Sequence, residues 1–234
     1  MIVYKMCYSI ESSLKTTAIS LFAILYMINS NEPYFIWIGI SLIGWCGMQF
    51  AELLLWLTNP INGCSEMNKL ITLTLIPLVL ILQPLSPLFG SLYVIPWNKS
   101  TEFRKHFILL YSIIIILGVG YCHFYKPYKL CTTVTPNRHL YWNTSKYMPT
   151  NTLSVIITYF LWAFLIILPL LLFWNKHFLL LALFIITPLF GFIYGLLFTD
   201  SKASIWCYYT SYTSITSIIL LFLKQMNIFD IMKL

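Results

Sequence analysis

The chain has 234 residues, of which 59% are hydrophobic and only 9% charged, and its mean hydropathy is +0.82. A soluble domain carries about a quarter charged residues, so this composition excludes a soluble globular protein and indicates a lipid bilayer as the surroundings. The net charge of +7 does not indicate nucleic-acid binding, because the basic residues are scattered over loops and the aromatic residues lie within or beside apolar segments.

Seven apolar segments are long enough to cross a membrane as helices. A transmembrane helix needs about 20 apolar residues, and such windows lie at 12–29, 34–58, 69–93, 106–122, 152–174, 178–198 and 204–226. No segment alternates like a strand of an outer-membrane barrel. We therefore expect an all-α polytopic membrane protein, a compact bundle of about seven transmembrane helices. It should form one membrane domain over residues 1–234, with consecutive helices antiparallel because most connections are short.

The second segment carries the most informative residue of the chain. Glu52 is the only formal charge between residues 34 and 57, and a carboxylate in hydrocarbon is costly unless it is paired, hydrated or protonated. One helical stripe of this segment carries two indoles and two polar side chains, at Trp45, Gln49, Glu52 and Trp56. Such a stripe predicts a helix that lines a wet or ligand-holding interior. The alternative is a neutral, hydrogen-bonded carboxyl with a structural role.

The third and seventh segments are also polar for membrane helices. Gln83-Pro84 and Ser86-Pro87 interrupt the third, and prolines inside a membrane helix are tolerated where the backbone faces protein or water. The seventh carries nine hydroxyl-bearing residues, namely Tyr208, Tyr209, Thr210, Ser211, Tyr212, Thr213, Ser214, Thr216 and Ser217. These features predict helices shielded from lipid, although fixed kinks and hydroxyls that only join helices explain them too.

The segment 123–151 is the one long connection, and we expect it to form a folded cap or lid on the outer side. Five of the six cysteines fall at the same predicted face as this loop, at Cys7, Cys64, Cys122, Cys131 and Cys207. Their placement suits an oxidising compartment and one or two disulfides. Cys7–Cys207 and Cys64–Cys131 are the predicted pairs, and free thiols packed as small apolar side chains are the alternative.

Basic residues gather weakly at the opposite face, at Lys99, Arg104, Lys105, Lys176, Lys224 and Lys233. We expect residues 96–105 to form an exposed basic loop there. The positive-inside rule then places this face in the cytoplasm. With seven spans, the N-terminus is outside and the C-terminus is cytoplasmic. No feature of the sequence indicates the oligomeric state.

The chain fits enzyme templates poorly. Its four histidines lack the spacing of a zinc site, and neither a GxSxG motif nor a Walker loop is present. We therefore expect no metal and no cofactor, and the motifs assign no catalytic residue.

Four short motifs follow one another along the chain: Met6-Cys7-Tyr8-Ser9, Met48-Gln49 with Glu52 and Trp56, Gln83-Pro84, and Ser204-Ile205-Trp206-Cys207. This set resembles an uncharacterised family of multi-spanning membrane proteins found in large DNA viruses and in bacteria. Chains of that family open with Met-Cys-Phe/Tyr-Ser and carry Gln-x-x-Glu-x-x-x-Trp and a Trp-Cys near the last span. The resemblance implies no activity, but it groups the motif residues as one set.

The leading hypothesis is a channel or transporter-like protein that conducts protons, ions or a small solute along a polar path. Glu52 would bind the cation or relay the proton. The residues expected along the path are Ser9, Gln49, Glu52, Trp56, Gln83, Trp206, Tyr209 and Thr213.

Two alternatives stay open beside this hypothesis. An intramembrane enzyme or redox protein would use Cys7 and Cys207 as nucleophile or redox partner and Glu52 as acid or base. A receptor-like or structural viral membrane protein would need only the seven-helix architecture, and analogy at the level of the fold is not a functional argument.

Overall fold

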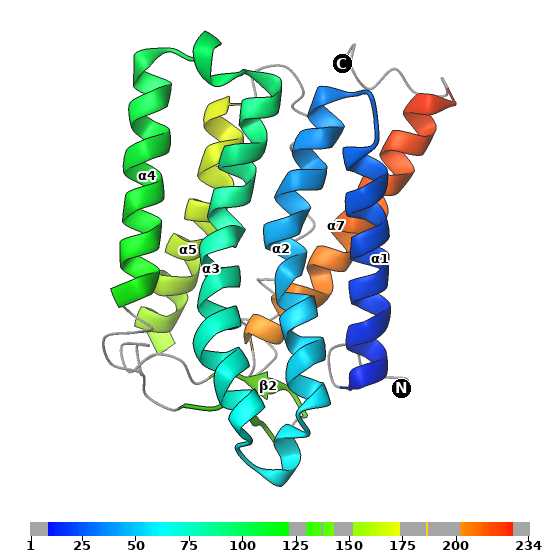
Figure 1. Cartoon of the computed structure of the whole chain (residues 1–234), viewed down its shortest axis with the longest axis vertical. Helices are drawn as coiled ribbons and strands as arrows, with labels where there is room; N and C mark the ends of the chain where they lie inside the picture. Colours follow the sequence, from blue (N-terminus) through cyan, green and yellow to red (C-terminus); the bar gives the residue numbers. More distant parts are fainter. Residues whose placement is uncertain are drawn as a thin grey trace.

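The structure is a computed structural model that describes residues 9–121, 130–136, 138–142, 152–173, 186 and 202–226. This part of the chain is mostly helical (Figure 1). Its α-helices are α1 (Ile10–Ile28), α2 (Pro33–Leu57), α3 (Glu66–Val94), α4 (Glu102–Gly120), α5 (Thr152–Phe173) and α7 (Lys202–Gln225). Two short 3-10 helices, η1 (Pro60–Asn62) and η2 (Trp97–Lys99), and two short strands, β1 (Thr133–Val134) and β2 (Leu140–Tyr141), lie in the connections.

The helices fall where apolar segments predicted them. Each predicted segment except 178–198 overlaps one of the six helices, and 178–198 lies outside the described residues apart from Ile186. Three helices, α2, α3 and α4, are long and apolar enough to cross a membrane. The protein is therefore a multi-pass integral membrane protein. The count of seven spans is finer than these three helices support, and it stays a prediction.

The helix α1 is amphipathic in the sense opposite to that of a helix on the surface of a soluble protein. On α1 the buried face carries hydroxyl groups, from Ser12, Ser13, Thr16 and Ser20. The exposed face carries large apolar side chains, among them Leu14, Leu21, Phe22 and Leu25. A helix on the surface of a soluble protein turns its apolar stripe inward. Here the polar groups lie inside, so the apolar outer face contacts lipid.

Two groups of helices lie on either side of α3 (Figure 1). On one side α2 packs against α1, α3 and α7, and on the other side α4 and α5 pack against α3. In Figure 1, α1, α3, α5 and α7 run in one direction, while α2 and α4 run in the other. We call the end of the bundle with the two strands the hairpin end. It holds the start of α1, the end of α2 and the start of α3, and the other end is called the far end.

The crossing of α2 and α3 is close because Gly44 lies at it. A Cβ atom on Gly44 would overlap the Leu82 carbonyl group and the Ser86 hydroxyl. The Ser86 hydroxyl donates to the Ser41 carbonyl at 3.0 Å, and the Trp37 indole N–H donates to the Pro87 carbonyl at 2.7 Å. The proline-containing part of α3 therefore faces another helix, which is where a membrane protein tolerates such residues.

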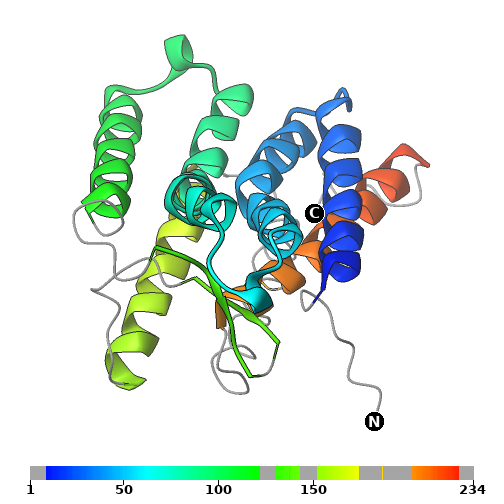
Figure 2. The same cartoon turned by 60° about the horizontal axis from the view of Figure 1, so that its bottom comes forward.

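A β-hairpin and a disulfide close the hairpin end. The strands pair antiparallel, with Val134 opposite Leu140, and Figure 2 shows them across the ends of α2 and α3. The Cys64–Cys131 disulfide, with Cα atoms 5.7 Å apart, joins the segment before α3 to the segment before β1. This predicted pair is thus confirmed, and the described part of the long loop is folded as expected. The other predicted pair includes Cys7, which lies outside the described residues.

Polar and apolar contacts reinforce this covalent link. Thr132 N–H donates to the Asn68 side-chain oxygen at 2.9 Å, and the Asn68 side-chain nitrogen donates to the Thr132 carbonyl at 3.0 Å. The hydroxyls of Thr72 and Thr132 lie 2.9 Å apart. Leu140 of β2 is buried in one apolar cluster with Met48, Ala51, Leu55 and Trp56 of α2. The hairpin is therefore anchored to both helices that it covers.

The connection at the far end differs from the exposed basic loop that we expected. α4 begins at Glu102, capped by the Thr101 hydroxyl, and Arg104 is only 5% exposed. Its guanidinium group donates to the Ile95 carbonyl at 2.8 Å, to the Ser91 carbonyl at 2.9 Å and to the Ser100 hydroxyl at 3.2 Å. Arg104 thus caps the end of α3: it bonds to the Ile95 carbonyl just beyond the helix and adds a second donor to the Ser91 carbonyl, which also accepts from the Ile95 N–H.

Candidate functional site

The side-chain amide of Gln49 lies where α1, α2 and α7 meet. Gln49 is fully buried (0% exposed). Its oxygen accepts a hydrogen bond from the Ser20 hydroxyl of α1 at 2.6 Å. Its nitrogen donates to the hydroxyls of Thr210 at 3.1 Å and Ser211 at 2.8 Å, both on α7. One amide therefore joins three helices through groups of complementary hydrogen-bonding capacity.

A second layer of polar contacts lies one turn farther from the hairpin end. The Cys46 sulfur and the Ser214 hydroxyl oxygen are 3.4 Å apart. The Ser214 hydroxyl also lies 3.2 Å from the Thr210 carbonyl and 3.4 Å from the Ser20 hydroxyl. All of these groups are buried. We call the set the Gln49 cluster, and its members are Ser20, Cys46, Gln49, Thr210, Ser211 and Ser214.

Glu52 lies one helical turn from Gln49 towards the hairpin end, on the same stripe of α2. It is also fully buried (0% exposed). It lies five positions before Leu57, the last residue of α2, and is therefore about 8 Å inside that helix at a rise of about 1.5 Å per residue. A buried carboxyl at this depth in a membrane-crossing helix marks a candidate site, because such groups face the bundle interior or a water-filled space.

Hydroxyl groups of α1 lie at the level of Glu52. The Ser20–Gln49 hydrogen bond fixes the register of the antiparallel α1 and α2. One turn towards the hairpin end from each partner reaches Thr17 on α1 and Glu52 on α2, and one further turn of α1 reaches Ser13. The hydroxyl oxygens of Ser13, Thr17 and Thr213 are buried and have no hydrogen-bond partner within the described part of the chain.

The interior of this three-helix group changes character towards the far end. Beyond the Gln49 cluster the buried side chains of α1, α2 and α7 are mostly apolar, among them Ala23, Met27, Phe35, Ile38, Leu42 and Leu221. The buried hydroxyls of Ser41 and Ser217 donate to carbonyl groups of their own helices. An ion pair closes this end, because the Lys224 ammonium lies 2.6 Å from the Glu32 carboxylate at the start of α2. The polar interior thus occupies the half near the hairpin, and an apolar layer separates it from the far end.

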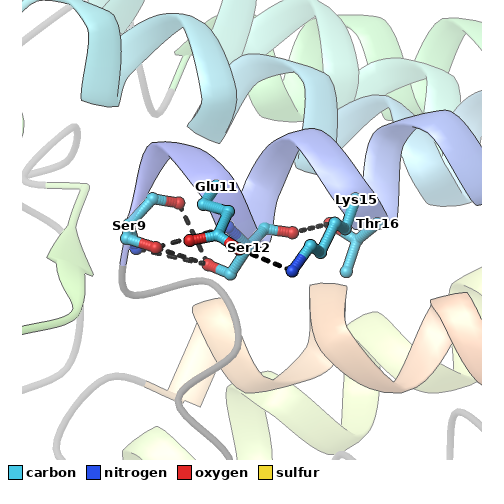
Figure 3. Close-up of polar contacts among 5 residues, drawn as sticks. All are labelled: Ser9, Glu11, Ser12, Lys15 and Thr16. Atoms are coloured by element: carbon cyan, nitrogen blue, oxygen red, sulfur yellow. Dashed lines mark hydrogen bonds and ion pairs between the residues drawn. The ribbon is translucent and has the colours of Figure 1, made fainter.

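Ser9, a predicted path residue, caps α1. Its hydroxyl accepts a hydrogen bond from the Ser12 N–H at 3.3 Å, and the Ser12 hydroxyl lies 3.2 Å from the Ser9 nitrogen, as Figure 3 shows. Beside this cap, the Lys15 ammonium lies 2.6 Å from the Glu11 carboxylate, and both side chains are exposed. Ser9 is exposed as well. Its local task is therefore to satisfy the first turn of α1.

The other predicted path residues are distributed over the bundle. The Gln83 side-chain oxygen accepts from the Trp162 indole N–H on α5 at 3.1 Å, on the other side of α3 from the Gln49 cluster. Trp56 packs in the apolar cluster that contains Leu140. The backbone of α7 includes Trp206, Cys207 and Tyr209, whose side chains lie outside the described part. Their predicted roles, and that of Cys7, stay predictions.

The structure adds hydroxyls of α1 that the sequence analysis did not single out. Ser13, Thr17 and Ser20 are four and three residues apart, which is the spacing of one helical face. That spacing is visible in the sequence as a polar stripe within an otherwise apolar segment. Among the described residues, no group of three or more His, Cys, Asp and Glu side chains is placed to hold a metal ion.

Comparison of the chain with protein-family models, with curated proteins and with solved structures found no match. The case for a function therefore rests on the chemistry of the chain's own residues.

Proposed function

We propose that the protein is a transporter-like membrane protein, in which protons, ions or a small solute pass through the polar interior between α1, α2 and α7. The observation that carries the proposal is the full burial of Glu52, one turn from an amide that links the three helices. A buried carboxyl in a membrane helix is costly to keep. A role in binding a proton or a cation would explain why the protein keeps a carboxyl group at this position despite the free-energy cost of burying it.

The contrast between the two halves of the interior favours a carrier over a permanently open channel. Polar groups fill the half near the hairpin, whereas Met27, Leu42 and Leu221 belong to the apolar layer near the far end. A small ion crosses an apolar layer poorly because it loses its hydration there. The described arrangement therefore corresponds to a closed far side, and transport would require α1 and α7 to move relative to α2.

A seven-span topology accompanies this proposal. α5 and α7 run in the same direction (Figure 1), so the chain between them has to return from the far end to the hairpin end. The predicted span 178–198 has the length for such a return. The Cys64–Cys131 disulfide suits an oxidising compartment at the hairpin end. The N-terminus is then outside and the C-terminus cytoplasmic.

The test is a flux measurement on purified full-length protein in liposomes, with proton and cation gradients applied separately. Glu52→Gln keeps the size of the side chain and one acceptor oxygen, replaces the other oxygen by an amide donor, and removes the charge and the titration. We expect this variant to lose flux. The matched control is Glu66→Gln, since Glu66 is an exposed acid at the start of α3, and it should transport as the wild type does. Equal flux in Glu52→Gln and the wild type would end the proposed role of Glu52.

A further inference from the structure

We infer that bound water occupies the interior beside α1 and connects Glu52 with the hairpin end, held by the hydroxyls of Ser13 and Thr17. The substrate class that this implies, a proton or a small hard cation, rests on the proposed function, whereas the water site itself does not. The inference begins with three buried hydroxyl oxygens, on Ser13, Thr17 and Thr213, that find no partner among the described residues.

Ser13 and Thr17 lack a hydrogen bond that a neighbouring hydroxyl on the same helix makes. Serine and threonine inside helices commonly donate to the carbonyl group one turn earlier. The Thr16 hydroxyl does so, at 3.2 Å from the Ser12 carbonyl and 3.1 Å from the Ser13 carbonyl. Ser13 and Thr17 leave this bond unmade, although both oxygens are removed from solvent. A buried polar group without a protein partner is the usual position of an ordered water molecule.

The spacing of the hydroxyls suits water bridges. Ser13 and Thr17 are four residues apart on one face of α1, a rise of about 6 Å. Two water molecules in series, with hydrogen bonds of about 2.8 Å each, cover that distance. Thr17 lies at the level of Glu52, so the carboxyl group can supply the additional polar partner that a buried water needs. The row ends at Ser20, whose hydroxyl already donates to Gln49.

The chemistry of the groups selects the class of substrate. The side chains described along this interface contribute hydroxyls, one amide, one thiol and the carboxyl of Glu52. Lys15, the basic side chain on α1, is exposed and paired with Glu11. Oxygen donors with one carboxyl suit a hard cation or a proton and disfavour an anion. Water that reaches Glu52 would deliver a proton by transfer along hydrogen bonds, or would hydrate a cation on its way to the carboxyl.

Water beside these side chains can be tested without any transport measurement. Three single variants of the full-length protein in lipid nanodiscs carry a near-isosteric or small cysteine probe: Ser13→Cys, Thr17→Cys and Ala23→Cys. Radiolysis of water produces hydroxyl radicals where water molecules lie, and peptide mass spectrometry then reads oxidation at each position separately. Ala23 is the matched control because it is buried on the same helix, in the apolar half. An intact Cys64–Cys131 disulfide checks that each variant is folded.

We expect oxidation at positions 13 and 17 to be about tenfold faster than at position 23, because hydroxyl radicals form only where water molecules lie beside the cysteine. Oxidation at position 17 that is no faster than at position 23 would overturn the water site.

Thr17→Val, which keeps the shape and loses the hydroxyl, should lower flux in liposomes about tenfold. If Glu52→Gln transports normally while position 17 is oxidised rapidly, the proposed function fails and the water site stands. If Glu52→Gln loses flux while position 17 stays dry, the reverse holds.

Discussion

Gln49 concentrates more of the interhelical polar bonding in its side chain than any other single group of the Gln49 cluster. Its oxygen accepts from α1, and its nitrogen donates to two hydroxyls of α7. Replacing the amide by an apolar group leaves those hydroxyls to find other partners in a buried interface. Because an unmade buried hydrogen bond costs more than a formed one contributes, the position is sensitive to truncation.

We therefore expect Gln49→Leu to lower the free energy of unfolding by about 1–3 kcal/mol. Thermal denaturation of the detergent-solubilised protein, followed by tryptophan fluorescence, measures the change. Thr74→Val serves as the control, because the Thr74 hydroxyl is exposed and bonded to the Leu70 carbonyl of its own helix. If Gln49→Leu melts at the same temperature as Thr74→Val, the cluster does not stabilise the contact of α1, α2 and α7.

Arg104 shows that the sequence alone does not reveal whether a charged residue at the end of a membrane helix is exposed in a loop or buried as a cap. Counted with Lys99 and Lys105, it looks like part of a basic loop that reports orientation. In the structure its guanidinium group bonds to Ser91 and Ile95 at the end of α3. A loop charge and a helix-capping arginine have the same sequence signature, because burial depends on how the next helix returns. The contribution of Arg104 to orientation is correspondingly weaker than that of the exposed Lys99.

At the scale of elements, the position of a helix was easier to predict than the neighbour that each of its faces contacts. The apolar windows located α2, α3 and α4 because lipid requires about 20 apolar residues per crossing. The stripe of Gln49 and Glu52 was also visible, since it depends only on helical periodicity. Gln83 was grouped with that stripe, yet it bonds to Trp162 on α5. Periodicity assigns a residue to a face of its own helix, and only the packing of the bundle decides what that face meets.

The α1 hydroxyls also show that a sequence profile does not tell which way a side chain points in the bundle. Lys15, Thr16 and Thr17 make 12–29 the weakest of the predicted spans, because a hydropathy average counts every polar residue against a span regardless of the direction in which its side chain points. The structure turns Ser13, Thr16 and Ser20 inward and exposes Leu14, Leu21 and Phe22. The apparent weakness of the segment was thus the signal of its polar inner face.

The crossing of α2 and α3 provides a prediction at this scale. Gly44→Ala should strongly reduce the yield of folded protein, because the added methyl group would meet the backbone of Leu82, which cannot move without shifting α3. Gly118→Ala on α4 is a matched control, since a Cβ there has nothing within 4 Å. Alanine also favours a helix over glycine by about 0.5–1 kcal/mol. Size-exclusion chromatography of both variants checks this, and equal recovery would contradict the close crossing.

At the scale of the whole molecule, the hairpin end is held by both covalent and noncovalent links. The disulfide spans a sequence separation of 67 residues, and the Asn68–Thr132 hydrogen bonds and the burial of Leu140 act at the same place. A cross-link over a loop of this length stabilises by about 4 kcal/mol in the chain-entropy model. The noncovalent contacts form only in the folded state, so they position the hairpin without restricting the unfolded chain.

We expect the double variant Cys64→Ser/Cys131→Ser to fold with its helices in place and to melt well below the wild type. A reductant should lower the melting temperature of the wild type to that of the double variant. A further decrease in the reduced double variant would reveal a second disulfide, such as the predicted Cys7–Cys207. If the double variant and the wild type melt together under oxidising conditions, the hairpin contacts alone account for the stability of this end.

The position of the disulfide also has a consequence for how the protein is made. Cys64 precedes α3 and Cys131 follows α4, so the two sulfurs meet only after the chain has crossed the bilayer and come back. A nascent chain halted with α3 inserted and α4 still in the translocation machinery keeps its thiols on separate sides. Formation of this disulfide during synthesis therefore marks the completed integration of the α3–α4 pair into the membrane. A gel-mobility shift on pulse-labelled chains would measure when that step of biogenesis occurs.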